Sequence, residues 1–336
     1  MKKENKKIIL NLSAIFVLFA VLMVLGSFFD LQISHAITKL DLTAGYYYST
    51  TIFGRFFETI GEMPIYLLVA FSGAVIFHNF SRRDSSTLNI VIKIIAVLAS
   101  VGMSIYMFHK LFKYLSQHFG FADVLGDVGD VVGYILLGIC FTFALFYFTR
   151  KLPSSFLNRM LKWAFIVFGT ALISQVFTHL IKPLASRPRY RAMFMLQNFE
   201  MFKQWFEFGG AKPDLKDEWI LLYGASSDWF KSFPSGHTSA GSTVITLTLI
   251  PYLFEKTNNV KCKLITWAVT IAYIMAVMFN RILVGAHFLT DVVFGLFLTV
   301  CAYLISLFIA NKFFSKLNVT PLSENKRPII IEQAED

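Results

Sequence analysis

Long apolar runs separated by short polar segments dominate the pattern of this chain. A helix needs about 20 apolar residues to cross the hydrocarbon core of a membrane. Eight runs approach that length and predict spans at Ile8–Phe29, Ile60–Phe80, Leu88–Phe112, Val131–Phe148, Trp163–Ile181, Thr238–Phe254, Leu264–Phe279 and Phe288–Phe308. The pattern therefore predicts an all-α fold, a polytopic membrane helix bundle of about eight spans.

Three of these spans are weaker than the rest. Glu62 and Pro64 shorten the apolar part of the second, and the sixth and seventh are short. The first run follows a lysine-rich start, as a secretory signal peptide would. It is longer than a usual signal core and lacks a clear small-residue cleavage site, so we predict an uncleaved first span.

Composition supports the membrane assignment. Of the 336 residues, 56% are hydrophobic and 15% are charged, whereas a soluble chain is about 25% charged. These values exclude a typical soluble enzyme, a disordered chain and a collagen-like fibre. The net charge of +10 could indicate nucleic acid, but basic cytoplasmic flanks explain it in a membrane protein, so no nucleic-acid partner is expected. Three cysteines indicate neither a disulfide framework nor a zinc site.

The lysines and arginines predict the orientation. With the N-terminus inside, the cytoplasmic segments hold more than half of them, so both termini are expected to be cytoplasmic. One outer region runs against this rule. A long loop can cross despite its charge, but clustering at span ends favours contact with an anion. This region, formed by the ends of spans five and seven and the loop between residues 183 and 233, carries Lys182, Arg187, Arg189, Arg191, Lys203, Lys212, Lys216, Lys231 and Arg281.

Two of three unusual stretches on this outer side lie at the start of the sixth span and at the end of the fifth. Pro234-Ser235-Gly236-His237 precedes that span, and a helix N-terminus with its free N–H groups binds phosphate. A plain N-cap is the alternative for Ser235. The stretch from Lys182 to Tyr190 is broken by Pro183 and Pro188. Its alternative reading is a solvated basic face or a lipid head-group contact.

The third stretch joins the last two spans. His287 and Asp291 are four residues apart, so on a helix they would share one face. The carboxylate could then hold one imidazole nitrogen and leave the other as a free nucleophile. The alternative is a satisfied polar pair inside the bundle. Arg281 lies six residues before His287, and Gly285 allows the chain to bring it round.

Together the three stretches supply what phosphoryl transfer requires. Cations and a helix N-terminus can stabilise charge on the equatorial oxygens of phosphorus. One histidine can attack phosphorus while a second protonates the leaving oxygen.

The ordered set Lys-x6-Arg, Pro-Ser-Gly-His and Arg-x5-His-x3-Asp, from Lys182 to Asp291, resembles the signature of the type-2 phosphatidic acid phosphatase superfamily. That family includes glucose-6-phosphatases, bacterial acid phosphatases and vanadium haloperoxidases. The resemblance implies that His287 is a nucleophile forming a phosphohistidine, that Asp291 orients it, and that His237 is the general acid and later the base. It implies phosphate binding by Lys182, Ser235, Gly236, Arg189 and Arg281, and no metal or cofactor.

The chain departs from the family pattern at two positions. Tyr190 follows Arg189, where the family usually has proline, and Asn280 stands where serine is usual. Since Arg187-Pro188 supplies the Arg-Pro dipeptide two residues earlier, Arg187 is the alternative phosphate ligand, although the spacing from Lys182 favours Arg189.

The resemblance also divides the chain. The family's common core has six spans with motifs at spans three to six, whereas here the motifs fall at spans five to eight. We therefore expect N-terminal spans with an added helix pair in residues 1–150, a phosphatase core in 151–315 and a cytoplasmic tail in 316–336.

The loop of residues 191–233 is rich in aromatics, which favour the membrane interface. We hypothesise that part of it is an interfacial helix guiding a lipid tail; a packed lid is the alternative. The expected protein is a multi-pass cell-membrane phosphatase acting at the extracytoplasmic face. Candidate substrates are undecaprenyl diphosphate, phosphatidic acid and phosphatidylglycerol phosphate. A lipid phosphotransferase and a transporter or scramblase with a phosphate-binding site remain alternatives, while hydropathy disfavours a soluble haloperoxidase.

Overall fold

The computed structural model describes residues 2–40, 49–82, 86–119, 126–209 and 213–316, and these form helices and no strand. This confirms the predicted all-α bundle. The predicted tail, residues 316–336, lies outside the described part except for Lys316. The elements are α1 (Lys2–Ile37), α2 (Ile52–Ile60), α3 (Met63–Phe80), α4 (Thr87–Phe119), α5 (Gly126–Arg150), α6 (Ser154–Ala185), α7 (Tyr190–Leu196), α8 (Pro213–Tyr223), η2 (Ser227–Phe230), α9 (Gly236–Gly241), η3 (Ser242–Leu249), α10 (Ile250–Leu253), α11 (Val260–Leu283) and α12 (Leu289–Lys316).

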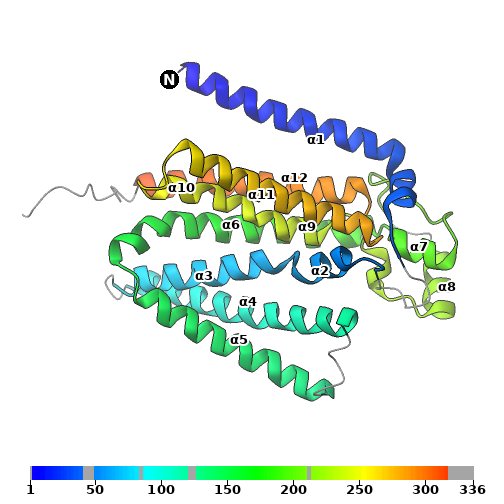
Figure 1. The fold of residues 1–336 in the computed structure, drawn as a ribbon, viewed down its shortest axis with the longest axis horizontal. Helices are drawn as coiled ribbons and strands as arrows, with labels where there is room; N and C mark the ends of the chain where they lie inside the picture. The colour runs from blue at the N-terminus through cyan, green and yellow to red at the C-terminus, as the bar shows by residue number, and fades with distance from the viewer. Residues whose placement is uncertain (1, 41–48, 83–85, 120–125, 210–212, 317–336) are drawn as a thin grey trace, which may run out of the picture.

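Among the described residues, seven helical segments are long and apolar enough to cross a membrane. They correspond to predicted spans one to five, seven and eight, and they lie roughly side by side in Figure 1. The observed segments are Ile15–Ile37, Ile52–Phe80, Thr87–His118, Gly129–Arg150, Ser154–Leu196, Val260–Leu283 and Leu289–Phe314. The chain is therefore a multi-pass helical membrane protein.

The predicted sixth span, Thr238–Phe254, is not one regular α-helix. The chain runs through α9, then the 3₁₀ segment η3, then α10. Within it the hydroxyls of Thr243, Thr246 and Thr248 each donate to the carbonyl three residues earlier, at 2.6–2.8 Å. Hydroxyl bonds to the preceding turn compete with regular α-helical bonding, which accounts for the tighter turns seen here.

Helices α3, α6 and α12 form the centre of the bundle. Helix α3 lies against α4 and α6, and α6 lies against α12. The buried Trp163 of α6 anchors η3, because its indole N–H donates to the Thr246 carbonyl at 2.9 Å. The central helices thus hold the broken segment in place from two sides.

Helix α1 packs along α12 in the opposite direction. Phe16 and Phe19 contact Phe297 ring to ring, while Gly26 lies against Thr290. The start of α1 and the end of α12 are consequently at the same end of the bundle, as Figure 1 shows. Helices α2, α7 and α8 lie at the opposite end.

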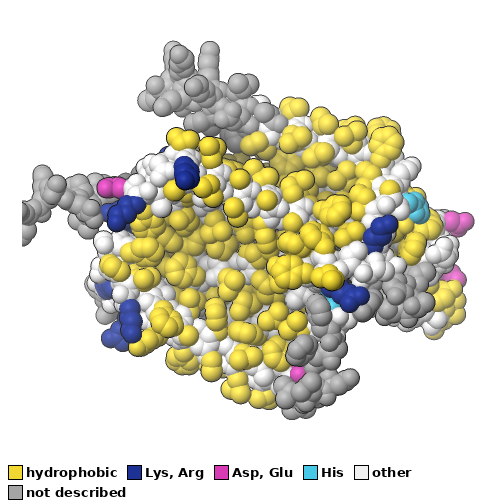
Figure 2. Space-filling model, viewed as in Figure 1, with side chains coloured by type: hydrophobic (Ala, Val, Ile, Leu, Met, Phe, Trp, Pro, Cys, Tyr) yellow, Lys and Arg dark blue, Asp and Glu magenta, His cyan; other side chains and the backbone are white. Residues whose placement is uncertain are grey.

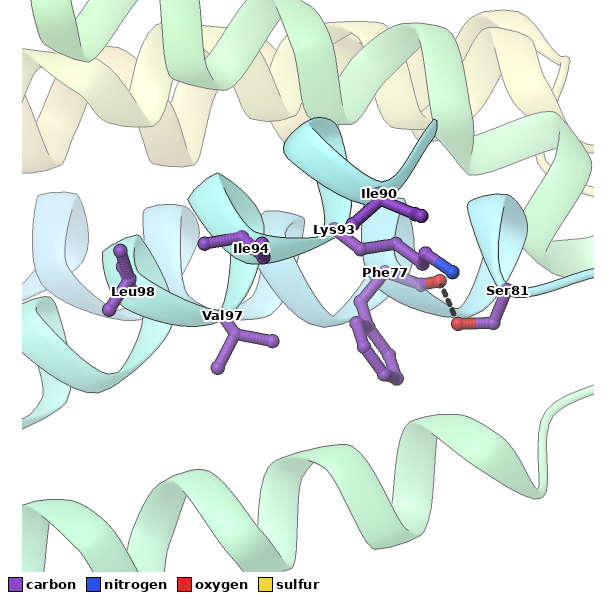
Figure 3. Close-up of a pocket in the computed structure, with 7 residues that line it drawn as sticks. All are labelled: Phe77, Ser81, Ile90, Lys93, Ile94, Val97 and Leu98. Carbon is purple, nitrogen blue, oxygen red and sulfur yellow. Dashed lines mark hydrogen bonds between the residues drawn. The ribbon is translucent and has the colours of Figure 1, made fainter. Parts of the chain in front are cut away.

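The outer surface of the bundle is apolar. Large hydrophobic side chains such as Phe28, Leu98 and Phe143 are exposed. Figure 2 shows this apolar surface running across the helices, with lysines and arginines towards its two edges. Such an arrangement suits a hydrocarbon core flanked by polar head groups. A pocket of about 370 Å³ on this surface is lined mainly by apolar residues around Phe77 and Leu98, with Lys93 beside them (Figure 3).

The aromatic loop mostly forms a packed cap. Trp219, Trp229 and Phe230 of the loop are buried in one cluster with Tyr190 and Phe288, which lie outside it. This packing matches the packed-lid alternative for these side chains. In α8, by contrast, the run 220–223 is exposed and apolar, so this helix remains the candidate for interfacial contact. Its contact with a lipid stays a prediction.

Candidate active site

A cavity of about 620 Å³ opens where the three sequence motifs meet. Helices α3, α4, α6 and α9 supply most of its wall. The predicted site residues that line it are Lys182, Arg189, Gly236, His237 and His287, whereas Ser235, Arg281 and Asp291 are buried beside it. The other lining residues are Glu62, Ile65, Tyr66, Met103, Tyr106, Lys110, Gln175, His179, Pro183, Asp228, Lys231 and Ala240.

Lys182 reaches the cavity from the last turn of α6. That helix ends at Ser186, which adopts a left-handed conformation with φ of 41°. Its backbone N–H still bonds to the Lys182 carbonyl at 2.9 Å. The Lys182 ammonium donates to the Lys231 carbonyl at 3.0 Å. The end of the aromatic loop therefore fixes Lys182 at the cavity wall.

Arg189 faces the cavity and is held by Asp228. Its Nε donates to the Asp228 carbonyl and its Nη2 to Oδ1, both at 2.8 Å. Burial would raise the pKa of Asp228, but Arg189 and Arg191 outweigh it and hold that pKa well below its ordinary value. Asp228 is therefore a carboxylate that orients Arg189.

Arg187 points away from the cavity into a buried ion-pair network. Its Nη1 lies 2.6 Å from Asp291 Oδ1, and its Nη2 lies 3.0 Å from Asp30 Oδ2. The guanidinium carbon also lies 4.2 Å from the centre of the Phe288 ring. Of the two arginines that the sequence offers as phosphate ligands, Arg189 is thus the one that the fold brings to the cavity.

His287 lies in the turn between α11 and α12, just after Gly285. That glycine has φ of 61°, a left-handed conformation that costs other residues energy. The His287 Nδ1 is 2.6 Å from the Ser232 carbonyl, which can only accept a hydrogen bond, so Nδ1 carries the proton. Burial lowers the pKa of His287 well below 6.5, and Arg189 and Lys182 act in the same direction. The ring is neutral, with its lone pair on Nε2.

Asp291 lies beside the His287 ring at ion-pair distance, longer than a normal hydrogen bond. Asp291 Oδ2 lies 3.8 Å from His287 Nδ1. It accepts instead from the Ser232 hydroxyl at 2.5 Å and from the Phe288 N–H at 2.9 Å. The reason is that α12 begins at Leu289, so His287 precedes the helix and does not share a helical face with Asp291. Asp291 acts on the ring through Ser232 and through its nearby charge.

His237 lies in the first turn of α9, behind the Ser235 cap. The Ser235 hydroxyl accepts from the Thr238 N–H at 3.3 Å, as the N-cap alternative expects. His237 Nδ1 lies 2.8 Å from Glu62 Oε1, and its Nε2 lies 3.0 Å from the Tyr114 hydroxyl. The second histidine of the site is therefore held from α3 and α4.

Arg281 lies in the last turn of α11 and is fully buried. Its Nη1 is 3.2 Å from Glu58 Oε1, and Arg191 Nη1 is at the same distance from that oxygen. Glu58 belongs to α2 and is itself buried. The predicted phosphate ligand Arg281 is thus paired with a carboxylate in the structure.

Sequence reasoning missed three carboxylates, Asp30, Glu58 and Glu62. Asp30 is in α1, Glu58 is in α2 and Glu62 directly precedes α3. They pair with Arg187, Arg281 and His237, respectively, which belong to the motifs or their flanks. A signal for them exists, since an ionisable residue within a membrane-spanning segment is a candidate for function. In the sequence pattern, Glu62 only shortens the apolar part of the second span.

In a comparison with protein-family models, residues 163–315 match the PAP2 superfamily. The match confirms the resemblance carried by the three motifs, all of which it contains. Neither the comparison with curated proteins nor the comparison with solved structures gave a match. The carboxylates Asp30, Glu58 and Glu62 lie outside the matched segment.

Proposed function

Proceeding from the match of residues 163–315 to the PAP2 superfamily, we propose that the protein is a membrane phosphatase of lipid phosphate or diphosphate esters. His287 is its nucleophile and forms a phosphohistidine. The observation that carries the proposal is the neutral, buried His287 lining one cavity with Lys182 and Arg189. A lone pair on Nε2 beside two fixed cations is an arrangement that favours attack on an anionic phosphorus.

In the first half-reaction, His287 Nε2 bonds to phosphorus and the bond from phosphorus to the lipid oxygen breaks. The leaving oxygen takes a proton from His237. Lys182 and Arg189 balance the charge on the equatorial oxygens, and Asp291, 3.8 Å from Nδ1, favours the cationic ring that forms.

In the second half-reaction, water attacks phosphorus and passes a proton to His237. The bond from phosphorus to Nε2 breaks, and inorganic phosphate leaves. Both histidines return to their starting states, so the net reaction converts one ester and one water into the lipid leaving group and inorganic phosphate. The proposed chemistry uses side chains alone, without a metal or cofactor.

An apolar side of the cavity supports a lipid substrate. Ile65, Met103 and Ala240 line it, along with Tyr66 and Tyr106. The segments predicted to be cytoplasmic hold more than half of the lysines and arginines, as the positive-inside rule requires. This distribution supports cytoplasmic termini and an active site on the extracytoplasmic side of the cell membrane. Undecaprenyl diphosphate and phosphatidic acid are the leading substrates that we propose.

The test is phosphate release by the purified full chain in detergent, with EDTA present. Undecaprenyl diphosphate, phosphatidic acid and glucose 6-phosphate are compared as substrates. His287→Ala should abolish release, whereas His78→Ala is the matched control, because His78 bonds to the Phe146 carbonyl away from the cavity. Release that survives in His287→Ala would refute the nucleophile.

Trapping the intermediate separates hydrolysis from its alternatives. Brief reaction with ³²P-labelled lipid should give an acid-labile, alkali-stable label on the wild-type chain and none on His287→Ala. Free phosphate as the product supports a phosphatase, whereas a newly phosphorylated acceptor identifies a phosphotransferase. Lipid transport that persists in His287→Ala, without phosphate release from the wild type, would identify a transporter.

A further inference from the structure

Glu62 is a buried carboxylate at the cavity that belongs to none of the three motifs. It is the residue before α3 and is only 8% exposed. One oxygen, Oε1, lies 2.8 Å from His237 Nδ1. The other, Oε2, accepts from the Tyr66 hydroxyl at 2.8 Å and lies 3.3 Å from the Lys110 ammonium. Burying a carboxylate costs free energy unless it is paired, and both oxygens of Glu62 have partners among His237, Tyr66 and Lys110.

His237 needs such a partner for its proposed chemistry. It must carry a proton to the leaving oxygen and later accept one from water, so it passes through the protonated form in each turnover. Burial disfavours a protonated imidazole, because the charged ring loses its hydration. A carboxylate on one ring nitrogen compensates for that loss and also fixes the orientation of the ring.

We propose that Glu62 is the positioning residue of His237, holding Nδ1–H so that Nε2 exchanges protons with the substrate, whose leaving oxygen takes the place of the Tyr114 hydroxyl now 3.0 Å from Nε2. This inference rests on the proposed function. During cleavage the Nε2 proton moves to the leaving oxygen as its bond to phosphorus breaks. During hydrolysis Nε2 takes a proton from the attacking water. Glu62 stays ionised and Nδ1 keeps its proton throughout, so charge and protons balance over the cycle.

The proposal makes the N-terminal helices part of the catalytic unit. Glu62 and Tyr66 come from the start of α3, and Lys110 comes from α4. All three line the same cavity as His287. The segment 163–315 that matches the PAP2 superfamily contains none of them. The acid–base function of His237 therefore depends on residues that its own motif does not supply.

The experiment measures phosphate release by the full chain with two substrates of different leaving group, decyl phosphate and para-nitrophenyl phosphate. Only the alkyl leaving oxygen needs a proton from His237. Glu62→Gln should slow decyl phosphate turnover by about 10²-fold, within the range of general acid–base steps, and para-nitrophenyl phosphate turnover much less. Glu62→Gln/His237→Ala should be no slower than His237→Ala alone, because Glu62 acts through that ring.

Two further variants keep the result independent of folding. Asn79→Ala removes a buried polar side chain from the same helix, one that bonds the Val75 and Leu157 carbonyls away from the cavity. It should lower the unfolding midpoint in detergent and leave phosphate release per folded molecule unchanged. Glu62→Asp keeps the carboxylate and should recover more decyl phosphate turnover than Glu62→Gln.

Equal loss on both substrates, or a loss in the double variant that adds to that of His237→Ala, would overturn the role of Glu62 while leaving the phosphatase intact. Wild-type turnover in Glu62→Gln would do the same. A wild-type protein that releases phosphate from no substrate would instead refute the proposed function, and this inference with it. The two failures are thus told apart by the wild-type measurement.

Discussion

Arg187 and Arg189 are two residues apart, and their substitutions should fail in different ways. Arg187→Ala leaves Asp30 and Asp291 buried without their shared cation. Removing one partner of a buried ion pair costs about 3–5 kcal/mol. At about 1.4 kcal/mol per factor of ten, this lowers the ratio of folded to unfolded protein by roughly two to three and a half orders of magnitude.

Arg189→Ala should act on turnover instead. Its partner Asp228 has a side chain that is 39% exposed, so losing this pair should cost only about 1 kcal/mol of stability. Removing a donor to developing oxyanion charge typically slows a reaction by about 10²–10³-fold. Arg189→Ala should therefore fold well and release phosphate slowly.

The assay combines denaturant unfolding in detergent with phosphate release per folded molecule. Arg187→Lys is a useful intermediate, because a lysine keeps the charge but lacks the guanidinium fork that bridges Asp30 and Asp291. The reasoning would be refuted if Arg187→Ala unfolded like the wild type and lost activity while Arg189→Ala stayed active. That result would move the phosphate contact to Arg187.

Three further predictions concern the rest of the site. Because burial and nearby cations lower the pKa of His287 well below 6.5, a fall in kcat/KM caused by its protonation should appear only well below pH 6.5. A wild-type profile that falls near pH 6.5, at a pH that shifts when a neighbour of His287 is replaced, would contradict this. Gly295→Ala should impair activity, because the added Cβ would lie 2.6 Å from the Ser235 carbonyl oxygen. Gly102→Ala is its control: no atom lies within 4 Å of the added Cβ, so activity should be unchanged and the protein equally or slightly more stable to unfolding. EDTA should not inhibit phosphate release, and strong inhibition that added metal reverses would count against the proposed mechanism.

Hydropathy was sufficient to predict most of the bundle. Spans that are apolar throughout, such as Leu88–Phe112, correspond to long regular helices. The broken course of residues 238–254 escaped the prediction, because hydropathy does not register hydroxyls such as those of Thr243 and Thr246 that bond the preceding turn. Local hydrogen bonding, not apolar length, decides the shape of that segment.

Motif spacing predicted which side chains gather at the cavity, including Lys182, Arg189 and His287. Motif spacing did not predict which groups hold the imidazole rings of His287 and His237. The Ser232 carbonyl binds His287 where a helical Asp291 was expected, because α12 starts after the histidine. The contact between Glu62 and His237 depends on how helices from distant parts of the chain pack together. Local sequence patterns do not predict that packing.

The pairing of Asp30 has a consequence for the order of assembly. Asp30 is in α1, which leaves the ribosome first, whereas Arg187 follows 157 residues later and Thr290 260 residues later. Until Arg187 is made, Asp30 lies near the end of an inserted helix without a cation, and until α12 is made it lacks its bonds from Thr290. Thr290 and Asp291 of α12 thus complete a network that Asp30 and Arg187 begin. Chains that stop before α12 should hold Asp30 and Arg187 as an incomplete buried network, in which α1 is fixed less firmly than in the full chain.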